Sequence, residues 1–284
     1  MDVGQYQGFH VDLHDPGITL VTFDQPERMN GMYGGMKRDL VEMLLQAQLD
    51  DAVRVVVFTG SGRAFCAGDD ISGGSAGGSR NPTKVPTNPP GHRQPIGTYD
   101  GLRAISQAVN RAVRDLDKLT VAAINGFAIQ TGFSLALSCD FRVASTEAKL
   151  GSATLRFGLL PDEGGQWLLV QTLGVARTMD FLMRKRIVSG AEALELGLVH
   201  EVCSPEELLD RSLSLARELA EGPQVAMRML KRSIHNAAEL SFAQACDEIA
   251  SKTAVTDWHA DAKEGEAAFR EKRSAQFNAW LERG

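Results

Sequence analysis

Two adjacent acidic residues are the strongest candidates in the sequence for side chains that take part in catalysis. Asp162 and Glu163 follow Pro161 and precede a Gly-Gly pair, in a turn before an apolar helical segment. A carboxylate in such a turn can take up and return a proton, activate water, or attack a substrate directly. Acidic side chains also favour helix N-termini, where they stabilise the positive end of the helix dipole. The pattern therefore predicts catalysis or capping, and each residue can serve one of the two.

Two glycine-containing turns, over residues 64–71 and 124–136, each follow a predicted buried strand. An apolar helical run follows Gly132, and the first turn of a helix has backbone N–H groups without an intrahelical partner. An N–H group from the turn at Gly68 and Asp69 could converge with them, giving the two donors of an oxyanion hole for a thioester enolate. Glycine lets the chain turn tightly and approach a ligand closely. Such turns are common, so ordinary turn structure stays the alternative.

The composition limits the classes of function. The chain has 284 residues, 43% of them hydrophobic, which is enough for one large core or a core with a helical appendage. A net charge of −6 argues against a nucleic-acid partner. The six histidines include no HExxH pattern, so no metal site is expected.

The sequence predicts a cytoplasmic protein without a membrane partner. No basic region followed by an apolar run stands at the N-terminus, and no apolar stretch reaches membrane-spanning length. No two cysteines form a CxxC pair, so we expect reduced, buried thiols in a reducing compartment. These cysteines are Cys66, Cys139, Cys203 and Cys246.

Strand-like and helical segments alternate in the first part of the chain. Residues 18–23 alternate in polarity, residues 36–49 repeat apolar side chains at helical spacing, and residues 53–59 form a β-branched run. Further strands are predicted at 121–125 and 141–144. Strands separated by helices imply crossover connections, so we expect a layered α/β core.

From Ser189 onward the sequence predicts helices. Ser189 and Glu192 fit a capping box, and Gly197 follows the end of that helix. The later helix starts are predicted at Ser204-Pro205, at Gly222-Pro223, at Ser241 and near Asp261.

Residues 72–101 are rich in Gly, Pro, Ser and Asn, which predicts a mobile loop. Because the loop follows the first glycine turn, it could act as a lid over the site. A disordered insertion without a function is the alternative, and the sequence does not choose between the two.

The two glycine turns resemble the paired signature segments of the crotonase superfamily, the enoyl-CoA hydratase/isomerase family. Residues 28–30 (RMN), 191–199 (AEALELGLV) and 263–273 (KEGEAAFREKR) resemble further family motifs. The resemblance covers almost the whole chain, with the 72–101 loop as the main misfit. It implies a ββα spiral core over residues 1–200 and a C-terminal helical trimerisation region over 201–284. It also implies homotrimers or dimers of trimers.

The resemblance also implies which groups would bind the substrate. Coenzyme A would enter as part of the thioester substrate, with no tightly bound cofactor. The oxyanion donors would be the backbone N–H groups of Asp69 and Thr131, although the family usually has glycine where Thr131 stands. The resemblance implies contacts to the substrate or to coenzyme A for Arg28, Ala67, Gly68, Asp70, Ile71, Gly132, Phe269 and Lys272. The contacts of Phe269 and Lys272 would cross a subunit boundary. For Arg28, Phe269 and Lys272 an ordinary surface or helix-packing role is equally open.

The chain departs from the family where a standard hydratase carries two glutamates. Those positions are Ser134 and Thr154, and neither can act alone as a general base near neutral pH. Asp162 resembles an aspartate that is active in family members that isomerise dienoyl-CoA or dehalogenate aromatic acyl-CoA. Glu163 resembles the single proton-shuttling glutamate of enoyl-CoA isomerases, and the choice between the two acids stays open.

The resemblance therefore implies an acyl-CoA enzyme that moves a proton in the manner of an enoyl-CoA isomerase. The alternatives are a hydratase that uses non-standard residues, an acyl-CoA hydrolase, or an acyl-CoA binder without catalysis.

Overall fold

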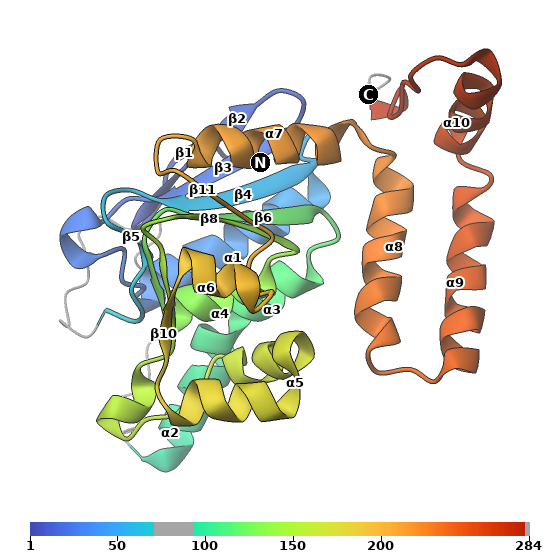
Figure 1. Ribbon diagram of the computed structural model, residues 1–284. Coiled ribbons are helices and arrows are strands. Elements are labelled where there is room, and N and C mark those ends of the chain that lie inside the picture. Colours follow the sequence, from blue (N-terminus) through green and yellow to red (C-terminus); the bar gives the residue numbers. More distant parts are fainter. Residues whose placement is uncertain (71–93, 282–284) are drawn as a thin grey trace.

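In a computed structural model of the protein, which describes residues 1–70 and 94–281, a seven-stranded sheet forms the centre of the core (Figure 1). The first three strands pair antiparallel, and the others run parallel to β3. In spatial order the strands are β1 (Gly4–Gln5), β2 (Phe9–His14), β3 (Ile18–Phe23), β4 (Val55–Gly60), β6 (Leu119–Ile124), β8 (Phe141–Ser145) and β11 (Glu201–Cys203). A smaller sheet has the order β10 (Ile187–Ser189), β9 (Lys149–Gly151), β7 (Phe127–Ile129) and β5 (Ala64–Cys66).

Strand β4 shows why the central strands are apolar along their whole length. Val56 and Phe58 are fully buried in the cluster that contains the apolar side chains of α1 (Gly34–Leu49). Val55 and Val57 are fully buried in a second cluster, with the side chains of α7 (Leu208–Glu221). A parallel strand covered on both faces has no position that favours a polar side chain.

The chain repeats one arrangement, in which a strand of the large sheet is followed by a strand of the small sheet and then by a helix. The pair β4-β5 leads, after residues outside the described ranges, to α2 (Pro95–Gly101), the π-helical η2 (Leu102–Ser106) and α3 (Gln107–Asp115). The pair β6-β7 leads to α4 (Thr131–Ser138). The pair β8-β9 leads to the 3-10 helix η3 (Thr154–Phe157) and to α5 (Gly165–Met183). This confirms the predicted ββα spiral core.

The strands and the helix expected at the start of the chain are confirmed. The predicted strand 18–23 is β3, the predicted helix 36–49 lies within α1, and the later predicted strands correspond to β4, β6 and β8. The prediction of a loop over residues 72–101 is wrong at its C-terminal end, because residues 95–101 form α2 with Pro95 in its first turn. Residues 71–93 of that loop lie outside the described residues.

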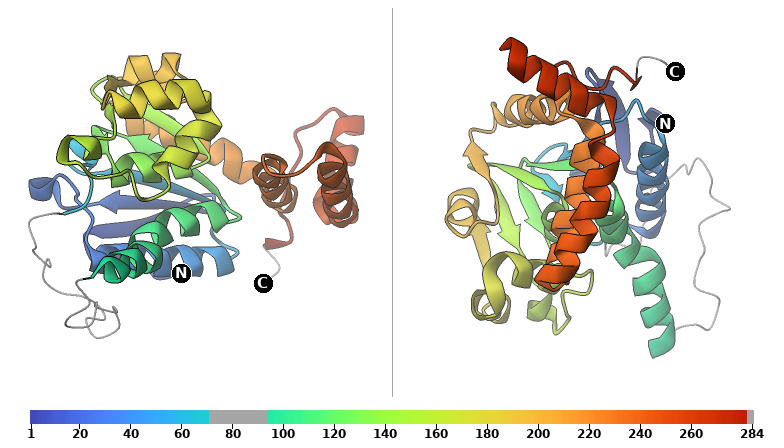
Figure 2. Two further views of the ribbon diagram at one scale, coloured as in Figure 1. Left: turned by 90° about the horizontal axis from the view of Figure 1, so that it is seen from below. Right: turned by 90° about the vertical axis from the view of Figure 1, so that its right-hand side faces the viewer.

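The C-terminal part contains one strand that the sequence pattern did not predict. Residues 201–203 form β11, which pairs parallel to β8, and α7 then packs against the large sheet. These residues therefore belong to the layered core, although residue 201 was expected to begin the helical region. Of the three helices after α7, α8 (Gln224–Ala237) lies nearest the core in Figure 1, and α9 (Phe242–Thr256) and α10 (Ala260–Glu271) stand farther out (Figure 2).

The predicted helix starts are found near their signals. The Ser189 side chain accepts a hydrogen bond from the Glu192 N–H group and caps α6 (Gly190–Glu195). Ser241 and Gln244 form a capping box at α9, and α8 begins directly after Pro223. The last helix begins at Ala260, with His259 rather than Asp261 as its N-cap.

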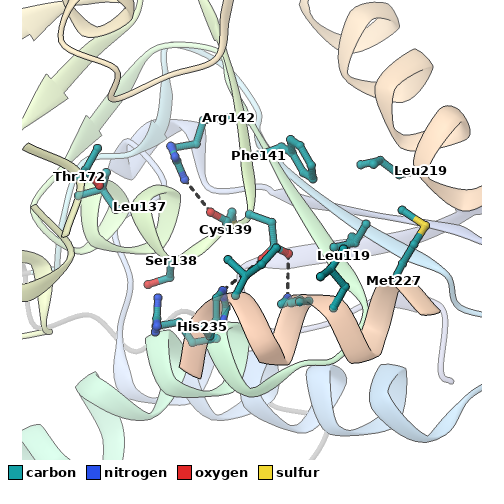
Figure 3. A pocket seen from close by; sticks show the side chains of 15 residues that line it. Leu119, Leu137, Ser138, Cys139, Phe141, Arg142, Thr172, Leu219, Met227 and His235 are labelled. Carbon is teal, nitrogen blue, oxygen red and sulfur yellow. Dashed lines mark hydrogen bonds and ion pairs between the residues drawn. The ribbon is translucent and has the colours of Figure 1, made fainter. Parts of the chain in front are cut away.

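A hollow of about 520 Å³ lies between α8 and the C-terminal end of α4 (Figure 3). Leu119, Phe141 and Met227 give it an apolar wall, and His235 and Arg142 bring polar groups to it. Thr131, at the start of α4, does not line it.

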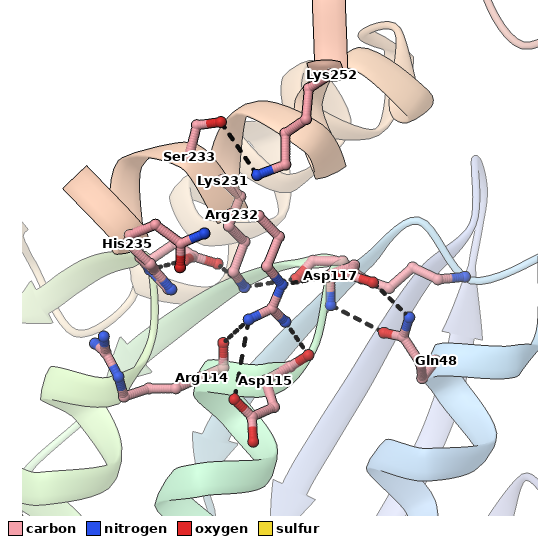
Figure 4. A network of polar contacts seen from close by, with 12 residues as sticks. Gln48, Arg114, Asp115, Asp117, Lys231, Arg232, Ser233, His235 and Lys252 are labelled. Carbon is pink, nitrogen blue, oxygen red and sulfur yellow. Dashed lines mark hydrogen bonds and ion pairs between the residues drawn. The ribbon is translucent and has the colours of Figure 1, made fainter. Parts of the chain in front are cut away.

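Buried and half-buried polar contacts hold α8 against the core beside this hollow (Figure 4). The Lys231 ammonium donates to Asp140 Oδ2 over 2.8 Å and to the Lys118 carbonyl oxygen over 2.9 Å. The Arg232 guanidinium contacts the Asp117 carboxylate and donates to the Arg114 carbonyl oxygen over 3.2 Å. Two cationic side chains of α8, Lys231 and Arg232, therefore fix the start of the helical region to the core.

All four cysteines are free thiols. Cys66, Cys139 and Cys203 are buried as expected, but Cys246 is exposed on α9, so its expected burial is wrong. No helix in the described part of the chain is both long and apolar enough to cross a membrane.

Candidate active site

The two glycine turns of the sequence meet at the start of α4. A Cβ atom on Gly132 would lie 2.0 Å from the Cys66 carbonyl oxygen, so only glycine lets α4 come this close to β5. Gly68 has a φ of +118°, in the region that side chains disfavour, and it faces Ile129 and Gln130 of the second turn. The two turns therefore lie directly against each other.

The residues expected to form the oxyanion hole are in contact through their side chains. Thr131 Oγ1 lies 2.7 Å from Asp69 Oδ1. Thr131 is the first residue of α4, so its backbone N–H group has no partner within the helix. The backbone on both sides of Asp69 is fixed to Met32, which donates to the Gly68 carbonyl oxygen and accepts from the Asp70 N–H group.

Helix α3 holds the turn that contains the two acids. Gln107 Nε2 donates to the Asp162 carbonyl oxygen over 2.9 Å, and Asn110 Nδ2 donates to the Glu163 carbonyl oxygen over 2.8 Å. The N-cap of α5 is Gly164, without a side-chain hydrogen bond, so capping does not explain either acid.

The two acids point to different environments. The Glu163 side chain is 1% exposed, and its Oε1 atom lies 2.6 Å from Thr131 Oγ1. Asp162 is half-buried, and its carboxylate has no hydrogen bond or ion pair with any residue that the structure describes. Of the two acids, Glu163 is thus the one tied into the glycine turns.

Lys37 belongs to the same cluster, although the sequence pattern did not single it out. Its ammonium lies 2.7 Å from Asp69 Oδ1, 3.5 Å from Glu163 Oε1 and 3.1 Å from Ser106 Oγ, and the side chain is 3% exposed. Lys37 lies on the buried face of α1 with Leu40 and Leu44. A lysine among the apolar positions of a helix is the signal that could have indicated it, because a buried ammonium needs a partner.

Burial dominates the electrostatics of the site. Burial raises the pKa of Glu163 to about 7, and the charges of Asp69 and Asp162 act in the same direction. Lys37 and the Thr131 hydroxyl act against this rise in pKa. Burial also raises the pKa of the neighbouring Cys66 to about 12, so this thiol stays neutral and is no candidate nucleophile.

A second arm of the polar network runs from Glu163 to Thr154. Gln130 Nε2 lies 3.5 Å from Glu163 Oε2, and Gln130 Oε1 accepts from Ser152 Oγ over 2.6 Å. Ser152 Oγ lies 3.1 Å from Thr154 Oγ1. Gln130 has a φ of 48°, which is a strained backbone conformation for a residue other than glycine. The strained residue is thus the one whose side-chain amide joins Glu163 to Ser152.

A model of the family "Enoyl-CoA hydratase/isomerase" matches residues 14–280. The chain belongs to the enoyl-CoA hydratase/isomerase family. It is 34% identical over 266 residues to the 1,2-epoxyphenylacetyl-CoA isomerase of Escherichia coli (strain K12), covering 93% of this chain and 95% of the relative. It is 31% identical to a probable enoyl-CoA hydratase of Rhizobium meliloti (strain 1021), covering 92% and 94%.

The fold is also that of solved members of this enoyl-CoA hydratase/isomerase family. A putative enoyl-CoA hydratase from Streptomyces coelicolor A3(2) superimposes with a TM-score of 0.85 at 28% identity, covering 98% of this chain and 96% of that one. An enoyl-CoA hydratase from Bacillus anthracis gives a TM-score of 0.84 at 26% identity, covering 95% and 99%. This enoyl-CoA hydratase/isomerase therefore has the crotonase fold.

The two positions expected to carry hydratase glutamates carry hydroxyl side chains in this enoyl-CoA hydratase/isomerase. Ser134 is buried in α4 beside Gly165, and Thr154 begins η3. Neither supplies a carboxylate, so Asp162 and Glu163 are the acids available in the turn before α5.

The expected coenzyme A contacts are only partly brought together within one chain. Arg28 Nη1 lies 2.9 Å from Asp70 Oδ2 beside the first glycine turn, and the Ala67 N–H group donates to the Met29 carbonyl oxygen. Phe269 is 86% exposed on α10, and Lys272 ends that helix, in the region that stands away from the core. Ile71 lies outside the described residues.

Within residues 1–70 and 94–281, no group of three or more His, Cys, Asp or Glu side chains is placed to hold a metal ion.

Proposed function

We propose that this enoyl-CoA hydratase/isomerase transfers a proton within an enoyl-CoA thioester, with Glu163 as the proton shuttle. The observation that carries the proposal is the Glu163 carboxyl, which is buried and lies 2.6 Å from Thr131 Oγ1 at the start of α4. A general base works best when its pKa is close to the working pH, and burial raises the pKa of Glu163 to about 7.

The proposed reaction shifts a double bond without gain or loss of a group. The thioester oxygen accepts hydrogen bonds from the backbone N–H groups of Asp69 and Thr131. Ionised Glu163 takes a proton from the carbon between the thioester and the double bond, and the electron pair moves onto the thioester oxygen as a dienolate. The same proton then returns to the far carbon, which regenerates ionised Glu163. The helix dipole of α4 supports the negative charge on that oxygen.

Asp162 is the second candidate for the shuttle in the same reaction. Its carboxylate is free among the residues the structure describes, but it lacks the hydrogen bond that joins Glu163 to Thr131. Since the two acids are adjacent in the turn, one of them can act on the substrate, and the charge of Asp162 raises the pKa of Glu163.

Hydration with non-standard residues is the alternative function. Relatives at similar identity are named as hydratases, among them the crotonyl-CoA hydratase of Syntrophomonas wolfei. Addition of water needs one acid and one base, and the neighbouring pair Asp162 and Glu163 could supply both.

The proposal includes an assembly. Coenzyme A would be held as part of the substrate by Arg28, Ala67, Gly68, Asp70, Ile71 and Gly132, with Phe269 and Lys272 from a neighbouring subunit of a homotrimer or a dimer of trimers. Large apolar side chains that are exposed on α9, on α10 and in the turn between them support such a neighbour, among them Phe242, Trp258 and Phe269. A cytoplasmic location, without nucleic acid or a tightly bound cofactor, is part of the same proposal.

The test offers 3-enoyl-CoA and 2-enoyl-CoA to the wild type and to Glu163→Gln, Asp162→Asn and the double variant. We expect the wild type to convert 3-enoyl-CoA to 2-enoyl-CoA, and Glu163→Gln to lose about 10²- to 10⁴-fold in kcat. Glu206→Gln, an exposed acid on the surface, should keep full activity.

Other outcomes separate the alternatives. Hydration of 2-enoyl-CoA as the fastest reaction would identify a hydratase, and release of free thiol would identify a hydrolase. Tight binding of both thioesters without turnover would identify a binder. Full isomerase activity in the double variant would overturn the assignment of both acids.

A further inference from the structure

The Thr131 hydroxyl lies between two carboxyl oxygens and has only one proton to donate. Thr131 Oγ1 is 2.7 Å from Asp69 Oδ1 and 2.6 Å from Glu163 Oε1. If both carboxyls were ionised, the hydroxyl could donate to only one of them, and its lone pairs would face the other anion at hydrogen-bond distance. A second proton on one of the two acids makes both of these short contacts hydrogen bonds.

The surroundings decide which acid holds that proton. The Asp69 side chain is 47% exposed and accepts a hydrogen bond from the Lys37 ammonium over 2.7 Å, so a negative charge there has both solvent and a cation in direct contact. The Glu163 side chain is 1% exposed and lies 3.5 Å from the same ammonium, so its ionised form has less solvent and a weaker contact. Glu163 is thus the acid that is protonated.

We infer that Lys37, Asp69, Thr131 and Glu163 form one proton-sharing cluster, in which Lys37 fixes the negative charge on Asp69 and Thr131 links that charge to protonated Glu163. This assigns roles to the side chains of Asp69 and Thr131 in addition to their backbone N–H groups. Lys37 and Asp69 are positioning residues here, because they act on the substrate through Glu163.

The Thr131 hydroxyl can serve both protonation states of Glu163. When Glu163 is protonated, the hydroxyl accepts from it and donates to Asp69. When Glu163 is ionised, the hydroxyl rotates and donates to Glu163, and the Lys37 ammonium then balances both carboxylates. Because each state keeps a hydrogen bond, the proton can leave and return at similar free energy, which a shuttle requires.

Other charged groups near Glu163 do not replace Lys37 in this role. Arg114 on α3 stacks 4.7 Å from the centre of the Trp167 ring, and Arg111 donates to the Arg103 carbonyl oxygen. Both arginines line a cavity of about 260 Å³ that Glu163 also lines. The groups that face Glu163 from the packed elements are Lys37, Cys66, Asp69, Arg111, Arg114 and Asp162.

The first test measures protonation directly and needs no turnover. The infrared band of a protonated carboxyl is followed from about pH 5 to 9, and Glu163→Gln identifies the part that belongs to Glu163. We expect the midpoint of this band to fall by about one pH unit or more in Asp69→Asn, because a neighbouring negative charge is lost. We expect it to rise by a similar amount in Lys37→Met, because a cation is lost. Asp210→Asn and Lys149→Met, both exposed, should leave it unchanged.

The second test is kinetic and rests on the proposed function. Thr131→Val should lower kcat about tenfold with little change in KM, and Thr131→Ser should restore it, because serine keeps the hydroxyl. The pH dependence of kcat/KM should shift in opposite directions in Asp69→Asn and Lys37→Met.

The two tests fail in distinguishable ways. A wild type without a carboxyl band that Glu163→Gln removes would overturn the cluster, as would unshifted midpoints in folded Asp69→Asn and Lys37→Met. The wild-type band decides the matter even if Lys37→Met does not fold. A shifted band without isomerase activity would contradict the proposed function and leave the cluster standing.

Discussion

The Ser134 hydroxyl lies against Gly165, so closely that a Cβ atom on Gly165 would fall 2.6 Å from Ser134 Oγ. Ser134 belongs to α4 and Gly165 begins α5, directly after the turn with Asp162 and Glu163. The contact thus sets how far the acidic turn lies from Thr131. A position expected to carry a hydratase glutamate is used here for close packing.

This contact predicts a specific pattern in a double-mutant cycle. Gly165→Ala should lower the free energy of unfolding by about 1–3 kcal/mol, because the new methyl group overlaps the Ser134 hydroxyl. Ser134→Ala alone should change it by less than about 1 kcal/mol. The double variant should recover most of the loss, since only Ser134 Oγ lies within 3 Å of the added Cβ. Urea unfolding measures all three, and additive losses would contradict the contact.

The raised pKa of Glu163 predicts how stability depends on pH. The folded chain holds this proton up to about pH 7, whereas an ordinary glutamate, as in the unfolded chain, releases it near 4.5. Between these values the folded state binds more protons than the unfolded state, so stability falls as the pH rises, and it stays lower above pH 7.

Glu163→Gln removes this titration. Its free energy of unfolding relative to the wild type should therefore grow by about 2–3 kcal/mol from about pH 4.5 to about pH 8. Thermal unfolding at several pH values measures the difference, and Glu206→Gln serves as the exposed control. Parallel stability curves for Glu163→Gln and the wild type would show that Glu163 titrates normally.

The Lys231–Asp140 pair predicts the strength of the link between α8 and the core. Among the residues that the structure describes, Lys231→Met leaves Asp140 Oδ2 with only its bonds from Thr120, so a buried charge loses its ammonium partner. We expect a loss of about 3–5 kcal/mol in the free energy of unfolding. Arg184→Met, which breaks the exposed pair with Asp180, should cost far less than Lys231→Met, because water already solvates both charges.

The same unfolding experiment contains its own check on the Lys231–Asp140 pair. Lys231→Met combined with Asp140→Asn should be more stable than Lys231→Met alone, because the unpaired charge is gone. Equal losses for Lys231→Met and Arg184→Met would show that the buried pair does not anchor α8.

The sequence by itself determined the elements whose pattern is local. Residues 18–23 form a strand with the predicted bounds, and the capping signals at Ser189 and Ser241 mark real helix starts. The glycine turns could also be predicted, because the chain approaches itself too closely at Gly132 for any side chain. In each case the cause lies within a few residues of the signal, or in a backbone contact that only glycine permits.

The tertiary structure decided what depends on distant residues. Strand β11 has only three residues and is a strand because β8 lies beside it. Which acid turns inward, and with which groups the buried Lys37 pairs, depends on distant residues: Lys37 and Asp69 are 32 residues apart, and Asp69 and Thr131 are 62 apart. The protonation of Glu163 is set by burial and by charges from other elements, so it exists only once the chain has folded.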